Sequence, residues 1–270
     1  MARHKMEFGT CRLCGKETEL SFEHVPPRVA FNRKTTYLSV KFDDFIKIDN
    51  PLEQQYKGKK KQGGIGYNSL CKNCNSFLGS NYVNSYTKWA IVGKELLGKG
   101  KFQYVEYRAL KQEPLRLLKQ ILSMFLAINK EWYLESYPEI SEFVKNPKSN
   151  ILPDRYRIFT YLKSEGNIRY NHHAVIYKPN LGGAVNCCEI AFAPYGYVLL
   201  FDYYKNLTLL NEITHFKNYS IDEEVDLEMG MFKLDTHGQF PLDYRNKEQF
   251  ASDIKKGIKA KNERLKDKDQ

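Results

Sequence analysis

Cysteine spacing gives the clearest indication of chemistry in this chain. Four of the six cysteines form two C-x-x-C pairs, the first made by Cys11 and Cys14 and the second by Cys71 and Cys74. Four thiolates complete a tetrahedral zinc site and leave no coordination position open to water or substrate. The pairs therefore predict a structural zinc site. In a reducing compartment, two C-x-x-C pairs fit metal binding better than disulfides.

The remaining cysteines and a pair of histidines are expected to play no part in metal binding. Cys187 and Cys188 are adjacent in an apolar stretch, and His172 and His173 are adjacent in a segment with strand character. Neighbouring residues on a strand point to opposite faces, so neither pair is placed to hold one ion together. We interpret Cys187 and Cys188 as small buried hydrophobic residues.

A Glu–His dipeptide follows the first cysteine pair. Glu23 and His24 lie in an alternating segment that predicts a short strand, and Pro26 and Pro27 end it. An imidazole with a pKa near 6.5 can accept a proton from water at neutral pH, and a carboxylate is a suitable ligand for a hard divalent cation. Such a dipeptide on its own is most often a surface feature, so its meaning depends on its neighbours.

Two asparagines flank the second cysteine pair. Asn68 precedes it and Asn75 follows it directly. Singly, they are typical turn and helix-cap residues. The order of cysteine knuckle, Glu23-His24, proline, Asn68, second knuckle and Asn75 resembles the zinc-knuckle, ββα-metal form of the HNH endonuclease family. The resemblance covers residues 8–90, about a third of the chain.

The resemblance implies a specific fold and site. In this family two strands and a helix hold one catalytic divalent metal, and a structural zinc fixes the ends. By position, Glu23 and Asn75 correspond to the metal ligands, His24 to the general base, and Asn68 to the asparagine that orients the loop carrying the base. Asn81 is the alternative ligand if the helix begins later. The implied reaction is Mg²⁺- or Mn²⁺-dependent hydrolysis of nucleic-acid phosphodiester bonds, with DNA as the expected substrate.

The segments around these residues give the expected framework. A helix is predicted from about residue 75, and its aromatic stripe is expected in the core, with members Phe77, Leu78, Tyr82, Tyr86 and Trp89. Residues 54–66 form a polar, glycine-containing segment with lysines at 57, 59, 60 and 61. We interpret it as a solvated connection, although the same lysines suit contact with phosphates.

The sequence predicts two domains of α+β class. Glycines at 93, 98 and 100 indicate a boundary, which gives an HNH domain over 1–92 and a larger α+β domain over 93–270 with a recognition or regulatory role. An amphipathic helix is expected over 115–128, with Pro114 in its first turn, and a charged helix over 247–265. Strands are expected over 156–162, 168–177, 184–193 and 197–201.

Composition agrees with a nucleic-acid partner. Lys and Arg outnumber Asp and Glu by 42 to 32, for a net charge of +10, and such an excess favours a polyanion through counterion release. The sequence has no stretch apolar enough to cross a membrane and no apolar leader, so we expect a cytoplasmic protein. By family analogy, modular chains of this kind serve bacterial restriction or phage defence.

Two rival interpretations use the same residues. A zinc-stabilised nucleic-acid-binding protein without catalysis would need the cysteines and lysines but not His24. A regulated effector would keep the nuclease silent until its C-terminal domain met a ligand or protein. Double-strand cutting by a single HNH site would also favour a homodimer.

Overall fold

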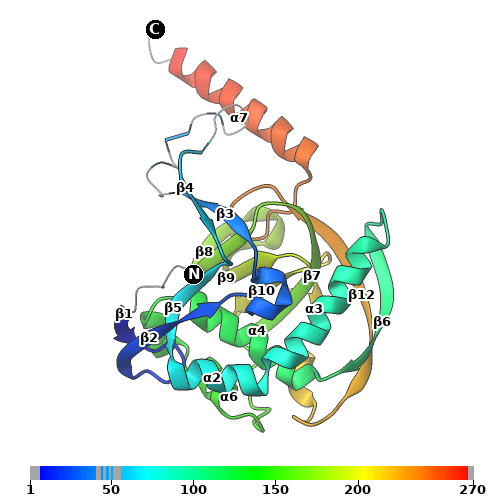
Figure 1. The fold of residues 1–270 in the computed structure, drawn as a ribbon. Helices are drawn as coiled ribbons and strands as arrows, with labels where there is room; N and C mark the ends of the chain where they lie inside the picture. The colour runs from blue at the N-terminus through cyan, green and yellow to red at the C-terminus, as the bar shows by residue number, and fades with distance from the viewer. Residues whose placement is uncertain (1–6, 41–43, 45–46, 49, 51–55, 267–270) are drawn as a thin grey trace.

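The computed structural model describes residues 7–40, 44, 47–48, 50 and 56–266. It confirms the α+β class. Its largest element is a seven-stranded sheet with a main path ordered β6-β12-β7-β10-β9-β8, to which β11 is added by pairing with β7 (Figure 1). The strands of this sheet are β6 (Tyr104–Gln112), β7 (Tyr156–Gly166), β8 (Arg169–Lys178), β9 (Gly183–Phe192), β10 (Tyr195–Phe201), β11 (Asn211–Glu212) and β12 (Val225–Thr236).

The C-terminal sequence contains the predicted elements and two long strands that were not anticipated. The four predicted strands correspond to β7, β8, β9 and β10, while β6 and β12 are additional and pair with each other. Helix α4 (Pro114–Ile128) has the expected bounds, with its proline at the first turn. It is buried on nearly every side, and α5 (Trp132–Ser136) and α6 (Pro138–Lys145) follow it.

A smaller sheet carries the N-terminal chemistry. It is antiparallel with the order β1-β2-β5, from β1 (Glu7–Thr10), β2 (Glu17–His24) and β5 (Gly66–Cys71). Helix α2 (Lys72–Asn81) follows β5 without a break, so the helix begins three residues earlier than predicted. It ends at Tyr82, after which α3 (Val83–Gly98) continues in a new helix.

The predicted aromatic stripe lies in the core. Leu78, Tyr82, Tyr86 and Trp89 are each at most 2% exposed, and the Trp89 ring stacks on Tyr195 of β10 with 4.8 Å between centroids. One buried cluster extends from Cys11 and Leu20 through α3 and α4 to the large sheet. Residue 92 falls inside α3, so a fragment ending there would divide a helix that contacts α4 and the large sheet.

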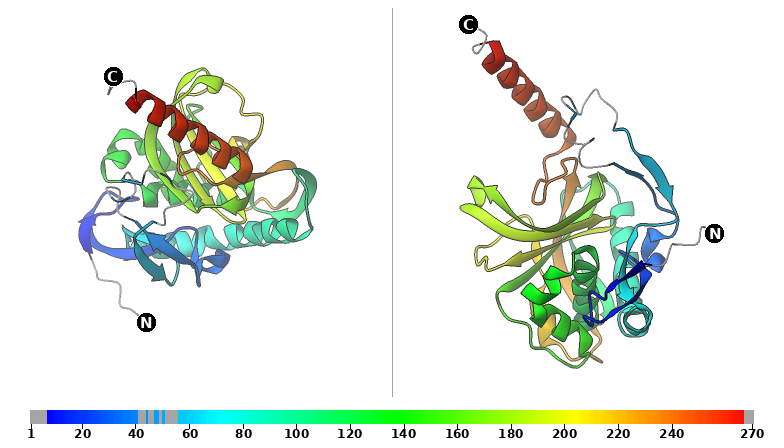
Figure 2. Two further views of the ribbon diagram at one scale, coloured as in Figure 1. Left: turned by 90° about the horizontal axis from the view of Figure 1, so that it is seen from above. Right: turned by 90° about the vertical axis from the view of Figure 1, so that its left-hand side faces the viewer.

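Two elements extend away from the packed body. Strands β3 (Thr36–Ser39) and β4 (Lys59–Gln62) pair only with each other among the described strands, and β4 forms inside the segment predicted as a loop. Helix α7 (Lys247–Lys266) matches its predicted bounds and points outward from the same end of the molecule (Figure 2). Short helical turns occur at η1 (Arg28–Asn32), η2 (Pro179–Leu181) and η3 (Thr214–Asn218). None of the helices in the described ranges has the length and apolar character needed to span a bilayer.

Candidate metal centre and active site

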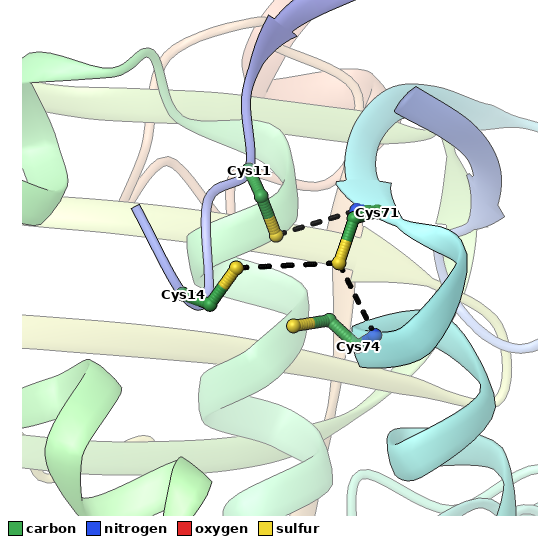
Figure 3. A group of neighbouring side chains, drawn as sticks. All are labelled: Cys11, Cys14, Cys71 and Cys74. Atoms are coloured by element: carbon green, nitrogen blue, oxygen red, sulfur yellow. Dashed lines mark hydrogen bonds between the residues drawn. The ribbon is translucent and has the colours of Figure 1, made fainter. Parts of the chain in front are cut away.

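The four cysteines of the two pairs meet at one point. Their sulfur atoms all lie within 4.8 Å of one another, and the Sγ atoms of Cys14 and Cys71 are 4.0 Å apart (Figure 3). A tetrahedral zinc site with bonds of about 2.3 Å places its sulfurs about 3.8 Å apart. The cluster therefore has the donor type, number and spacing to hold a metal ion such as zinc.

Local backbone geometry aims these sulfurs at a common centre. After β1 the chain makes a tight turn in which Gly15 donates its N–H to the Cys11 carbonyl at 2.9 Å, with Gly15 at a φ of +74°. Cys71 ends β5 and caps α2, where its Sγ accepts the N–H of Cys74 at 3.4 Å. The Sγ of Cys11 in turn accepts the Cys71 N–H at 3.3 Å. Donors aimed at sulfur favour the thiolate form that binds metal.

Hydrogen bonds between the thiols shift their pKa values in opposite directions. A hydrogen bond from Cys74 lowers the pKa of the Cys11 thiol to about 4. The same interaction raises the pKa of Cys74, because its proton is shared with the Cys11 thiolate. A bound cation would favour the thiolate form of all four cysteines.

The cluster is also fixed to the rest of the protein. Arg12, between the first two cysteines, forms hydrogen bonds with two other segments. Its backbone N–H donates to the Ser69 carbonyl at 2.8 Å, and its Nε donates to the Asn129 carbonyl at 3.2 Å. Its guanidinium also pairs with Glu131 at 3.0 Å. These contacts join the β1–β2 turn to β5 and to the end of α4.

His24 ends β2 and packs against a glycine backbone. Its Nε2 lies 3.3 Å from the carbonyl oxygen of Gly63, and its ring meets Phe22 edge to face at 4.9 Å. Gly64 has a φ of +100°, and a Cβ there would lie 2.8 Å from Cδ2 of His24 and 2.1 Å from the Asn32 carbonyl oxygen. Only glycine fits so close to the imidazole.

Glu23 is a buried carboxylate on β2. It is 8% exposed, and its side chain forms no hydrogen bond or ion pair with the residues that the structure describes. The β2–β5 register places it opposite Tyr67. Burial raises the pKa of Glu23 from 4.5 to about 7. A buried charge that is neither paired nor hydrogen-bonded is costly, and such groups are concentrated at functional sites.

The predicted asparagines lie beside the same part of β2. Asn68 stands opposite Phe22 in the β2–β5 pair. The Nδ2 of Asn75, in the first turn of α2, donates to the Ser21 Oγ at 3.1 Å and to the Phe22 carbonyl at 3.4 Å. Asn81 is different, because its Nδ2 donates to the Phe77 carbonyl of its own helix at 2.8 Å. Asn75, rather than Asn81, is the helix residue in contact with β2.

The sequence did not indicate two residues that hold the loop after His24. Asn32 is fully buried, and its Nδ2 donates to the carbonyls of Pro26 at 2.8 Å and Ile65 at 2.7 Å, while its Oδ1 accepts the Ile65 N–H at 2.8 Å. The Tyr170 hydroxyl, on β8, donates to the Val25 carbonyl. No local pattern marks either residue, because their partners lie far away in the chain.

The other two adjacent pairs lie on strands of the large sheet. Cys187 and Cys188 are fully buried on β9 and belong to separate clusters on opposite faces of the sheet. On β8, the Nε2 of His173 lies 2.7 Å from the Tyr137 hydroxyl, whereas the His172 ring lies 6.5 Å from Tyr67. In the described ranges, the four-cysteine cluster is the one group of three or more such side chains close enough to bind a metal together.

Comparison with known proteins gives no relative from which a function could be transferred. No protein-family model, curated protein or solved structure matches this chain. The resemblance to the HNH family therefore rests on the sequence motifs alone. The function has to be argued from the chemistry of the site.

Proposed function

We propose that this protein is a metal-dependent endonuclease of the HNH type that hydrolyses DNA, with His24 as the general base. The observation that carries the proposal is the junction between β2 and α2. The four-cysteine cluster ties the start of α2 to the small sheet, and Asn75 contacts the backbone of the strand that bears Glu23 and His24. About fifty positions of sequence separate the two segments that meet at this junction.

One contact of His24 supports its proposed role as the base. A carbonyl oxygen only accepts, so the Nε2 that faces Gly63 is the nitrogen that carries the proton. The neutral ring then has its lone pair on Nδ1, which is the atom that would take a proton from water. Gly64 and Asn32 hold the surrounding backbone, so the ring is positioned by residues that do not themselves react.

Glu23 and Asn75 are the residues that would hold the catalytic cation. A carboxylate and an amide oxygen suit Mg²⁺ or Mn²⁺, and both Nδ2 bonds of Asn75 go to β2, which leaves its Oδ1 as the oxygen for a ligand. When bound, such a metal neutralises charge on the phosphate and on the departing oxygen. The burial of Glu23 also supports this assignment, because a nearby cation would offset the cost of its charge.

The cysteine cluster has a supporting role in this proposal. Four sulfur ligands suit zinc and leave no open position, so the ion stabilises the fold rather than reacting. The excess of basic residues supplies attraction for DNA phosphates. A protein that only bound nucleic acid would use these features too, but it would not need a base at His24.

The direct test is cleavage of supercoiled plasmid by the full chain with Mg²⁺, Mn²⁺ or EDTA. His24→Ala is expected to abolish nicking, whereas His215→Ala, an exposed histidine on η3, serves as the matched control and keeps it. Plasmid binding should survive in both variants. Equal nicking by His24→Ala and wild type would refute the assignment of the base, and binding without cleavage in the wild type would favour the binding-only alternative.

A further inference from the structure

The β3–β4 arm, residues 36–39 and 59–62, starts at the His24 site. Gln62 ends β4, and the next residue, Gly63, is the one whose carbonyl lies against the imidazole. The base of the arm is held firmly: Gly64 donates its N–H to the Thr35 carbonyl at 3.3 Å, and Asn32 binds both the N–H and the carbonyl of Ile65. Whatever the arm binds is therefore positioned relative to His24.

Lysines dominate the exposed surface of this arm. They stand at positions 57, 59, 60 and 61, and all four are exposed and form no ion pair or hydrogen bond with the described residues. Consecutive strand residues alternate in direction, so Lys59 and Lys61 share one face and Lys60 lies on the other. The two-stranded arm thus presents positive charge on both faces.

Helix α7 is a second basic projection at the same end of the molecule (Figures 1 and 2). Over its 20 residues it carries seven Lys or Arg and three Asp or Glu, a net charge of +4. Asp253 pairs with Arg245 at 2.9 Å and with Lys256 at 3.8 Å, and Glu263 lies 4.0 Å from Lys259. A helix of this length extends about 30 Å, which matches the rise of roughly nine base pairs of duplex.

We propose that the β3–β4 arm and α7 are two phosphate-binding arms that hold a B-form DNA duplex and bring one strand to His24. The part of this inference that brings a strand to His24 rests on the proposed function. A two-stranded β element fits the major groove of B-form DNA, which is about 12 Å wide. The major groove of A-form RNA is too narrow to admit side chains, so duplex RNA would not fit the same arm.

The test is duplex binding by the full chain in EDTA, so that cleavage plays no part. A 30-base-pair DNA is titrated over a range of salt concentrations, with fluorescence anisotropy as the readout and circular dichroism to check folding. Three triple variants are compared with wild type. They are K59Q/K60Q/K61Q in the β3–β4 arm, K255Q/K256Q/K259Q in α7, and K16Q/K99Q/K148Q, a control at exposed lysines outside both arms.

Counterion release sets the expected size of the effect. Three lost phosphate contacts lower the slope of log K against log salt by about 2.7, and they weaken binding at about 0.15 M salt by up to about 100-fold. Each arm variant should approach this change in slope and affinity. A variant that carries both sets of arm substitutions should show the sum of the two effects, because the arms contact separate phosphates. The control should keep the wild-type slope.

Several results would overturn the inference. They are an arm variant with the slope of the control, equal affinity for duplex RNA and duplex DNA, or a wild type that binds single strands more tightly than duplex. The proposed function fails differently. A protein that shows the expected slopes but never nicks plasmid would support the two arms and refute the nuclease.

Discussion

Replacing Glu23 with glutamine is expected to stabilise the protein while removing its activity. Burial raises the pKa of Glu23 from 4.5 to about 7, so ionising it in the folded state costs roughly 3 kcal/mol, at about 1.4 kcal/mol for each tenfold change in the equilibrium. Glutamine has nearly the same shape and no charge. At pH 8 and without a divalent cation, Glu23→Gln should therefore have a free energy of unfolding about 3 kcal/mol above that of the wild type.

The pH dependence has a definite sign. Between pH 4.5 and 7 the unfolded chain has lost the Glu23 proton but the folded protein keeps it, so the wild-type free energy of unfolding falls as the pH rises. Below pH 4.5 the carboxyl is protonated in both states, and this contribution to stability is fully present. The advantage of Glu23→Gln should thus be absent near pH 4.5, grow through the window, and level off above pH 7.

The measurement is urea unfolding at several pH values, followed by the fluorescence of Trp89 and Trp132. Glu19→Gln, at an exposed position on the same strand, is the matched control and should stay within about 0.5 kcal/mol of wild type. Adding Mg²⁺ should then stabilise the wild type but not Glu23→Gln, because only the wild type binds the cation in its folded state. A Glu23→Gln protein no more stable than wild type at pH 8 would refute the reasoning.

The remaining predictions concern the metal ligands and the loop after His24. Cys74→Ser should lose zinc, measured by metal analysis, and its Tm should fall by about 10 °C because metal binding contributes to folding. A wild type purified with less than about half a zinc per chain would contradict this prediction. Asn32→Ala should lower the free energy of unfolding by about 3 kcal/mol, since three buried hydrogen bonds contribute about 1 kcal/mol each. The exposed Asn150→Ala is its control in the same urea assay, and a loss below about 1 kcal/mol would count against the role of Asn32. Asn75→Ala should slow plasmid nicking about 100-fold, because Asn75 is the proposed cation ligand. Asn81→Ala should slow it only slightly, because Asn81 bonds its own helix. Equal nicking rates in the two variants would contradict the assignment of Asn75 as the ligand.

Some features of this protein follow from sequence alone, because they depend on neighbouring residues. A C-x-x-C spacing brings two thiolates to one side of a tight turn, so two such pairs predicted the cluster that the structure contains. Helix α4 and strands β7 to β10 were predicted from apolar periodicity, which reports local amphipathic character. Burial of Cys187 and Cys188 on opposite faces followed from the alternation of a strand.

The start of α2 was predicted less well, for an identifiable reason. The sequence placed the start of the helix near residue 75, but α2 begins at Lys72 because the Cys71 sulfur accepts an N–H from its first turn. Cysteine is not among the usual capping residues, so the pattern gave no signal. The sequence predicted a loop over residues 54–66. Strand β4 forms there because its backbone pairs with β3, a contact that the local lysine-rich sequence does not indicate.

Only the tertiary structure decided how the proposed site is held. Asn32, Gly64 and Tyr170 fix the backbone around His24 through contacts with residues distant in sequence, which no local pattern encodes. The burial that raises the pKa of Glu23 likewise depends on how the small sheet packs against the rest of the protein. The sequence determined which groups are available for chemistry; their desolvation and mutual positions arise from long-range packing, which exists only once the chain has folded.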